Sequence, residues 1–184
     1  MATFQFPDVP DLQKIANALG PWIRPRRDLV PQYVEKVLQV YFVDLKDLRS
    51  DKSARECLTD SGIWHIQILA DDQAASFARG SKPHNQEGWN IHVVSGPSDA
   101  KAIANALDHV HDNFPDKYVV KILEIPAYFI TALTLEDGDD IQVYIVDAAP
   151  GIGLEISSTY PFDRMRKILS TRDPVRGIID PGDH

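Results

Sequence analysis

The chain has 184 residues, which is a usual length for one domain. Its formal net charge is −8 at pH 7, with 19 Lys and Arg against 27 Asp and Glu. Sequence-independent binding to nucleic acid depends on Lys and Arg that neutralise phosphates. We therefore expect neither nucleic acid nor an anionic membrane surface as a partner.

The single cysteine, Cys57, excludes an intramolecular disulfide and a metal site built from several cysteines. One free cysteine fits the reducing conditions of the cytosol. The first residues lack the basic start and the apolar run that are typical of a secretory signal. The sequence thus predicts a cytoplasmic protein, with no metal and no cofactor.

The first third of the chain, residues 8–60, is predicted as a helical block. A short helix over residues 10–19 has apolar residues at helical spacing and ends at Gly20. A longer helix is predicted from Pro31 to about Leu48. Val40 and Val43 widen its apolar face and also fit a strand, so both interpretations stay open at that point. A third helix is predicted over residues 51–58.

The connector after the first helix has the densest positive charge of the chain, from Arg24, Arg26 and Arg27. In one interpretation it is a solvated loop that balances the acidic excess elsewhere. In the other it binds a carboxylate or phosphate group, because guanidinium groups bind such anions with two hydrogen bonds.

Strands are predicted over residues 63–69, 73–79 and 89–94, where apolar side chains alternate. A helix over residues 99–113 follows, with Ser98 as its N-cap. Residues 118–146 are rich in β-branched and aromatic residues and predict two strands bent at Pro126, a hairpin turn at Asp137-Gly138 of type I′, and a returning strand. A last helix is predicted over residues 161–169. The tail, residues 171–184, has few core residues and is expected to be loosely held.

Separate runs of helices and strands are typical of the α+β class. We predict one domain over residues 1–170, in which a helical block (8–60) precedes a sheet-rich part (63–147) and a C-terminal helix (161–169). Its single, largely antiparallel sheet has about five or six strands, and the helices lie mainly on one face. Only the connection from Val94 to Tyr118 is long enough for a parallel crossover.

Two histidines, His65 and His92, lie at the centres of predicted strands and on their more polar faces. Neighbouring strands could bring the two imidazoles together for acid–base chemistry or zinc binding. Such a site needs a third group, and Asp147 and Glu124 are the candidates by strand position. The alternative is two half-exposed histidines on a solvated sheet face.

None of the familiar catalytic motifs occurs in the sequence. The sequence therefore favours a small cytoplasmic protein-interaction or adaptor domain without catalytic activity, whose partner is another protein or a second copy. Trp64, Trp89 and Tyr144 are the candidate interface residues, since aromatic residues anchor interfaces. The alternative is a small-ligand-binding protein or an enzyme with a histidine-containing pocket on the sheet.

Overall fold

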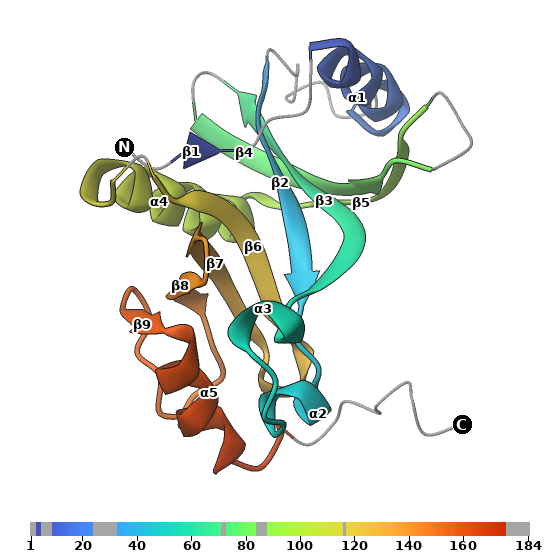
Figure 1. The fold of residues 1–184 in the computed structure, drawn as a ribbon. Helices are drawn as coiled ribbons and strands as arrows, with labels where there is room; N and C mark the ends of the chain where they lie inside the picture. The colour runs from blue at the N-terminus through green and yellow to red at the C-terminus, as the bar shows by residue number, and fades with distance from the viewer. Residues whose placement is uncertain are drawn as a thin grey trace.

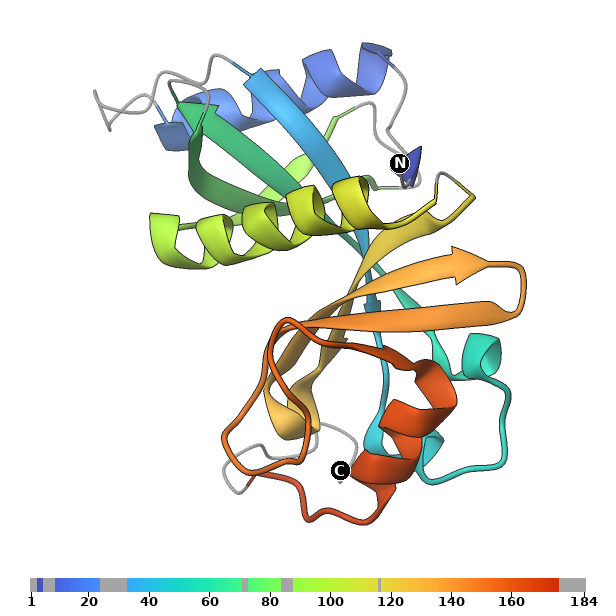
Figure 2. The same ribbon diagram turned by 90° about the vertical axis from the view of Figure 1, so that its left-hand side faces the viewer.

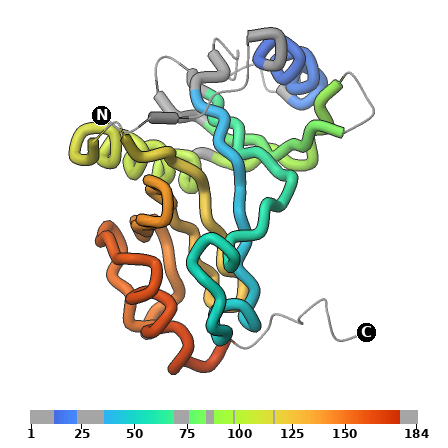
Figure 3. Tube along the Cα trace, in the orientation of Figure 1, coloured from blue at the N-terminus to red at the C-terminus, as the bar shows by residue number. Residues whose placement is uncertain are grey.

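The fold was analysed in a computed structural model that describes residues 3–4, 9–23, 33–70, 73–83, 88–115 and 117–175. Figure 1 shows the ribbon, and Figure 3 the Cα trace in the same orientation. The helices and strands follow the order β1 (Thr3–Phe4), α1 (Val9–Ile23), β2 (Tyr33–Phe42), α2 (Leu45–Leu48), α3 (Ala54–Cys57), β3 (Thr59–Ala70), β4 (Gln73–Ser81), β5 (Asn90–Ser95), α4 (Pro97–Asn113), β6 (Val119–Ile125), the 3-10 turn η1 (Pro126–Tyr128), β7 (Ile130–Asp137), β8 (Asp140–Asp147), β9 (Thr159–Pro161) and α5 (Phe162–Ser170).

All described strands belong to one mixed sheet of nine strands, in the order β5-β4-β3-β2-β6-β7-β8-β9, with β1 beside β6. Two antiparallel units, β2 to β5 and β6 to β9, meet where β2 runs parallel to β6. β2 pairs with the second half of β6, and β1 pairs with its start. The predicted α+β class is confirmed, but the sheet is larger than the five or six strands that we expected.

Helices lie on both faces of the sheet: α4 covers one face, and α1, α2, α3 and α5 pack on the other. α1 packs against one face of β2, β3 and β4 in a cluster that includes Ile15, Leu19, Val37 and Ile66. Successive residues of a strand point to opposite faces, so Leu38, next to Val37, faces away from α1. We call these the α1 face and the α4 face.

α4 covers the opposite side and joins the two halves of the sheet. Its buried residues Ile103, Leu107 and Val110 pack with Leu38 of the first half and with Leu133 of the second, among others. Figure 2 shows α4 lying between the two halves. This helix therefore packs against both halves of the sheet.

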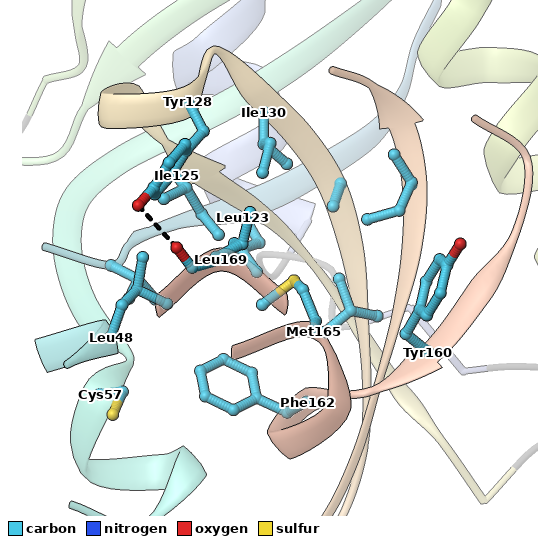
Figure 4. Close-up of a cluster of buried hydrophobic side chains, with 14 of the residues drawn as sticks. Leu48, Cys57, Leu123, Ile125, Tyr128, Ile130, Tyr160, Phe162, Met165 and Leu169 are labelled. Atoms are coloured by element: carbon cyan, nitrogen blue, oxygen red, sulfur yellow. Dashed lines mark hydrogen bonds between the residues drawn. The ribbon is translucent and has the colours of Figure 1, made fainter. Parts of the chain in front are cut away.

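A third cluster lies on the second half of the sheet, on the α1 face. Met165 and Leu169 of α5 pack there with Leu48 of α2 and with strands β6, β7 and β8 (Figure 4). The hydroxyl of Tyr128 donates a hydrogen bond of 2.8 Å to the carbonyl oxygen of Leu169, which fastens the end of α5 to the turn after β6.

The longer helix predicted from Pro31 to Leu48 is wrong over most of its length. Residues 33–42 form β2, and only residues 45–48 are helical. β2 lies in the interior of the sheet and pairs with β3 and β6, so buried apolar residues such as Val37 and Leu38 point to both of its faces and strict alternation is lost. Such a run resembles a buried helix in sequence. The strand interpretation of Val40 is the correct one.

The hairpin predicted within residues 118–146 is confirmed, with two corrections. Asp137 pairs with Asp140, so the turn residues are Gly138 and Asp139, one position later than predicted. Only Gly138 of the two has a positive φ, 61°, which fits a turn with glycine first, as in type II′, rather than type I′. Pro126 does not bend one strand but begins the 3-10 turn between the antiparallel strands β6 and β7.

The connection through α4 is not a parallel crossover between its own two strands. It leaves β5 at one edge of the sheet and enters β6 in the middle, beside β2. Part of the predicted tail is fastened, since the amide of Val175 donates to the carbonyl oxygen of Ala127 at 2.9 Å, and residues 176–184 lie outside the described part. None of the described helices is long and apolar enough to cross a membrane.

Candidate interaction site on strand β5

The two ends of the sheet differ in how well they are protected against pairing with another strand. β9 has three residues, Thr159–Pro161, and its Pro161 lacks an amide proton. β5 has six residues, contains no charged residue and no proline, and no described strand pairs with its outer edge. Natural edge strands are usually shortened, charged or interrupted by proline. β5 shows none of these three protections, although it carries a β-bulge, which is a further protection of edge strands.

β5 carries a β-bulge opposite the junction of Arg79 and Gly80. Arg79 pairs with Val93 and Gly80 pairs with Ile91, so His92 is the extra residue. The bulge places Ile91 and Val94 on the same face, where both pack against the α1 cluster. In a regular strand, residues three apart point to opposite faces.

Gly80 permits the close approach of β5 at this point. A Cβ atom on residue 80 would lie 2.8 Å from the carbonyl oxygen of Asn90, closer than side chains and backbone come in proteins. Glycine is therefore required where β4 meets the bulge of β5.

His92 and Val93 are both exposed on β5, and Val93 keeps 43% of its surface in contact with solvent. The Nε2 atom of His92 lies 2.8 Å from the hydroxyl oxygen of Ser81. Ser81 points to the α4 face, because it shares the pairing pattern of Arg79 and Phe77 on β4. The apolar side chain of Val93 and the imidazole of His92 thus lie next to each other on the edge strand β5.

His65 does not lie beside His92. It is in β3 and pairs with Arg79 in β4, and Val93 of β5 is the next residue in that row. Its side chain has no solvent exposure and stacks on Phe77, with ring centroids 4.6 Å apart. Burial, together with the charge of Arg79, lowers the pKa of His65 to about 3, so the ring is neutral at pH 7.

Neither ring nitrogen of His65 has a hydrogen-bond partner among the described residues, and the same holds for the side-chain oxygen of Gln67, two residues further along β3. Both side chains face α4. Buried polar atoms of this kind are often bound by internal water. The imidazole is sealed from solvent, so it cannot reach a substrate in this conformation.

Arg79 is the group near His65 that the sequence did not indicate as a site residue. Its guanidinium forms an ion pair with Glu124 of β6, and their side chains are 23% and 15% exposed. Glu124, one of the two carboxylates considered with the histidines, is therefore engaged with Arg79. The predicted strand over residues 73–79 contains Arg79, but the sequence does not show that Arg79 pairs with His65.

Asp147, the other carboxylate candidate, lies at the exposed end of β8 and pairs with Thr131, which in turn pairs with Glu124. Its Oδ1 accepts a hydrogen bond from the amide of Ala148 at 2.9 Å. His65, His92 and Asp147 thus do not form one cluster. In the described part of the chain, no group of three or more His, Cys, Asp or Glu could hold a metal ion.

Of the three aromatic residues expected at an interface, Trp89 and Tyr144 are core residues and Trp64 is partly buried against the core. Trp89 is 6% exposed and makes an edge-to-face contact with the partly buried Trp64, with centroids 6.0 Å apart, in the α1 cluster. Tyr144 is 5% exposed and stacks on His109 of α4. Their aromatic surface is used within the fold. Arg24, Arg26 and Arg27 lie outside the described residues.

A second polar network lies on the α1 face, where β2 meets β6. The Nζ of Lys121 donates to Glu136 at 2.9 Å and to the hydroxyl of Tyr41 at 3.3 Å, and it lies 4.4 Å from the Tyr41 ring centroid. Burial acts to lower the pKa of Lys121, but these hydrogen bonds outweigh it and the pKa is raised. Thr134 also donates to Glu136, at 3.0 Å. These groups satisfy one another, as a structural network does.

Apart from β5, large exposed apolar side chains are scattered among the described residues: Trp22, Phe129 and Ile156. Phe129 is 54% exposed and has a φ of 49°, in the left-handed region. In comparisons with protein-family models, with curated proteins and with solved structures, the chain matches none of them.

Proposed function

We propose that this protein is a small protein-interaction or adaptor domain without catalytic activity, and that strand β5 is the element that binds its partner. The observation that carries the proposal is the open edge of β5, six residues long and free of charge and proline. An exposed strand edge binds another chain by adding a strand to the sheet, with backbone hydrogen bonds for affinity and alternate side chains for specificity.

The histidine sites support this proposal more than the enzymatic alternative. His65 is fully buried and neutral, and His92 is an exposed residue of β5. A catalytic pair needs both imidazoles within reach of one substrate. Strand β4, which contains Arg79, lies between the strand of His65 and the strand of His92 and so separates the two imidazoles.

We also propose a cytoplasmic location. Its support is the single cysteine, Cys57, which is buried and has no second cysteine in the sequence to form a disulfide with. Free thiols of this kind fit a reducing compartment.

The experiment is affinity capture with two matched variants. His92→Lys places a charge in the open edge of β5, and Asn105→Lys adds the same charge on an exposed residue of α4. We expect wild type and Asn105→Lys to bind one identified partner in stoichiometric amount, and His92→Lys to lose it. Equal binding by all three proteins would show that β5 is not the interaction element.

A further inference from the structure

The structure assigns an occupant to the open edge of β5: we propose that it pairs with β5 of a second copy of this chain, antiparallel and about a twofold axis between His92 and Val93. This inference rests on the proposed function, because it names the partner at the same element. The pairing requires that the two β5 edges match in three respects. These are the face of the sheet to which each side chain points, the charge of the edge, and the apolar side chains that the contact buries.

The first argument is the order in which successive side chains of β5 point to the α1 face or to the α4 face. Asn90, Val93 and Ser95 pair with Ser81, Arg79 and Phe77, whose side chains point to the α4 face, and His92 is hydrogen-bonded to Ser81 on that side. Ile91 and Val94 point to the α1 face. From residue 90 to residue 95 the faces are therefore α4, α1, α4, α4, α1, α4. This order is the same in both directions.

Residues that pair directly across two antiparallel strands share a face. A second β5 that runs the other way places Asn90 opposite Ser95, Ile91 opposite Val94 and His92 opposite Val93, and every pair shares a face. If the axis moves to His92 or to Val93, an α1-face residue meets an α4-face residue. A regular strand pairs with this order only if one residue of β5 is left without a direct partner, as β4 does at Gly80. Shorter registers centred on Ile91 or Val94 also match in face, but this is the register that pairs all six residues of β5.

Charge is the second argument. The chain carries a net charge of −8, which opposes the association of two copies in general. β5 has no charged residue, and the neighbouring helix α1 has one acidic and one basic residue, Asp11 and Lys14. The surplus of acidic residues therefore lies on other elements, and the β5 edges can meet without like charges opposite each other.

The third argument is the set of apolar side chains that the contact buries. Pairing the two edges places Ile91 beside Val94 of the second copy on the α1 face, where both already pack against the α1 cluster. The two apolar clusters then continue into one another across the axis. A contact made by six residues from each chain is smaller than that of a stable permanent dimer. The dimer should therefore form and dissociate with protein concentration.

The first measurement is the mass of the purified full chain by light scattering and sedimentation over a wide concentration range. We expect a shift from the mass of one chain to that of two, and at least about tenfold weaker association for His92→Lys, since a 1.4 kcal/mol repulsion is a factor of ten. Asn105→Lys should associate as wild type does.

The second measurement tests the register. In the variant Asn90→Cys/Ser95→Cys, each new cysteine faces the other one across the axis, within the Cα separation that a disulfide spans. Mild oxidation should give a covalent dimer, whereas Asn90→Cys alone, which also retains the buried Cys57, should give no covalent dimer. Circular dichroism confirms that each variant is folded.

A monomer at all concentrations overturns self-pairing. It leaves the proposed function standing if His92→Lys still abolishes capture of another protein. A dimer that is insensitive to His92→Lys, or that gives no crosslink in the double-cysteine variant, overturns the inference as well, because the copies then meet through another surface.

Discussion

Arg79 of β4 reaches Glu124 of β6 although β3 and β2 lie between their strands. The two halves of the sheet meet at β2 and β6, so this ion pair ties the first half to the second on the α4 face. Breaking a buried ion pair leaves one charge without compensation, at a cost of about 3–5 kcal/mol. Both side chains keep some exposure, which reduces the expected cost.

We expect Glu124→Gln to lower the free energy of unfolding by about 1–3 kcal/mol in urea denaturation, as breaking a partly buried pair costs less than breaking a fully buried one. The double variant Arg79→Met/Glu124→Leu should recover most of the loss. The control is Lys46→Ala, which removes a far more exposed ion pair with Asp44 and should change stability by less than about 1 kcal/mol. Equal effects for Glu124→Gln and the control would refute the role of the buried pair.

His65 makes stability sensitive to acid. Its pKa is about 3 in the folded protein, because burial and then Arg79 disfavour the charged ring, and about 6.5 when the chain unfolds. The contribution is fully present above pH 6.5 and is lost as the pH falls towards 3, because the unfolded chain binds a proton that the folded chain rejects. The loss amounts to at most ~1.4 kcal/mol per pH unit.

The variant His65→Leu has no group that titrates at this position. We expect its stability to fall less steeply than that of wild type between pH 6.5 and pH 3, while the carboxylates common to both proteins cancel in the comparison. Gln67→Leu, which alters a buried neighbour on β3 that does not titrate, should keep the wild-type slope. Parallel curves for wild type and His65→Leu would contradict a buried neutral imidazole.

Phe129 follows the 3-10 turn with a φ of 49° and an exposed ring. The left-handed region costs a residue with a Cβ atom about 1–2 kcal/mol, whereas glycine adopts it freely. Phe129→Gly should therefore raise the melting temperature, and Phe129→Ala, which keeps the Cβ atom, should not. A lower melting temperature for the glycine variant would mean that contacts of the ring outweigh the backbone conformation.

Gly80 should be intolerant of a side chain. Because a Cβ atom there meets the carbonyl oxygen of Asn90 at 2.8 Å, we expect Gly80→Ala to destabilise the protein by about 1–3 kcal/mol and to weaken the pairing of β5 with β4. Gly88→Ala is the matched control, since no atom lies within 4 Å of its added Cβ. Thermal unfolding of the two variants makes the comparison, and equal melting temperatures would rule out a close contact at Gly80.

The sequence predicted the elements whose patterns are local. The alternation around Ile66 and the spacing of Ile103, Leu107 and Val110 indicated β3 and α4, and the glycine at position 138 indicated a hairpin. β2 was predicted as a helix because a strand buried on both faces has no alternation. The spacing of the apolar residues in β2 alone could not distinguish a strand from a helix.

The candidate site depends on the order and pairing of strands, which no local sequence pattern shows. The distance between His65 and His92 depends on the strand order, in which β4 separates β3 from β5. The exposure of Val93 depends on one extra residue in the pairing of β4 with β5, which reverses the alternation after Ile91. Trp64 and Trp89 have the composition of an interface, but α1 covers them, and the sequence does not show where α1 lies.

The most direct test of the interaction edge is hydrogen exchange of the β5 amides in the full chain, measured from dilute to concentrated protein. In a single copy no described strand accepts hydrogen bonds from the outward amides of residues 90–95, and in the paired state they donate to the second copy. We expect their protection to rise with protein concentration, while the amides of β7, an interior strand, remain equally protected throughout. Exchange of the β5 amides at the same rate at every concentration would contradict the account.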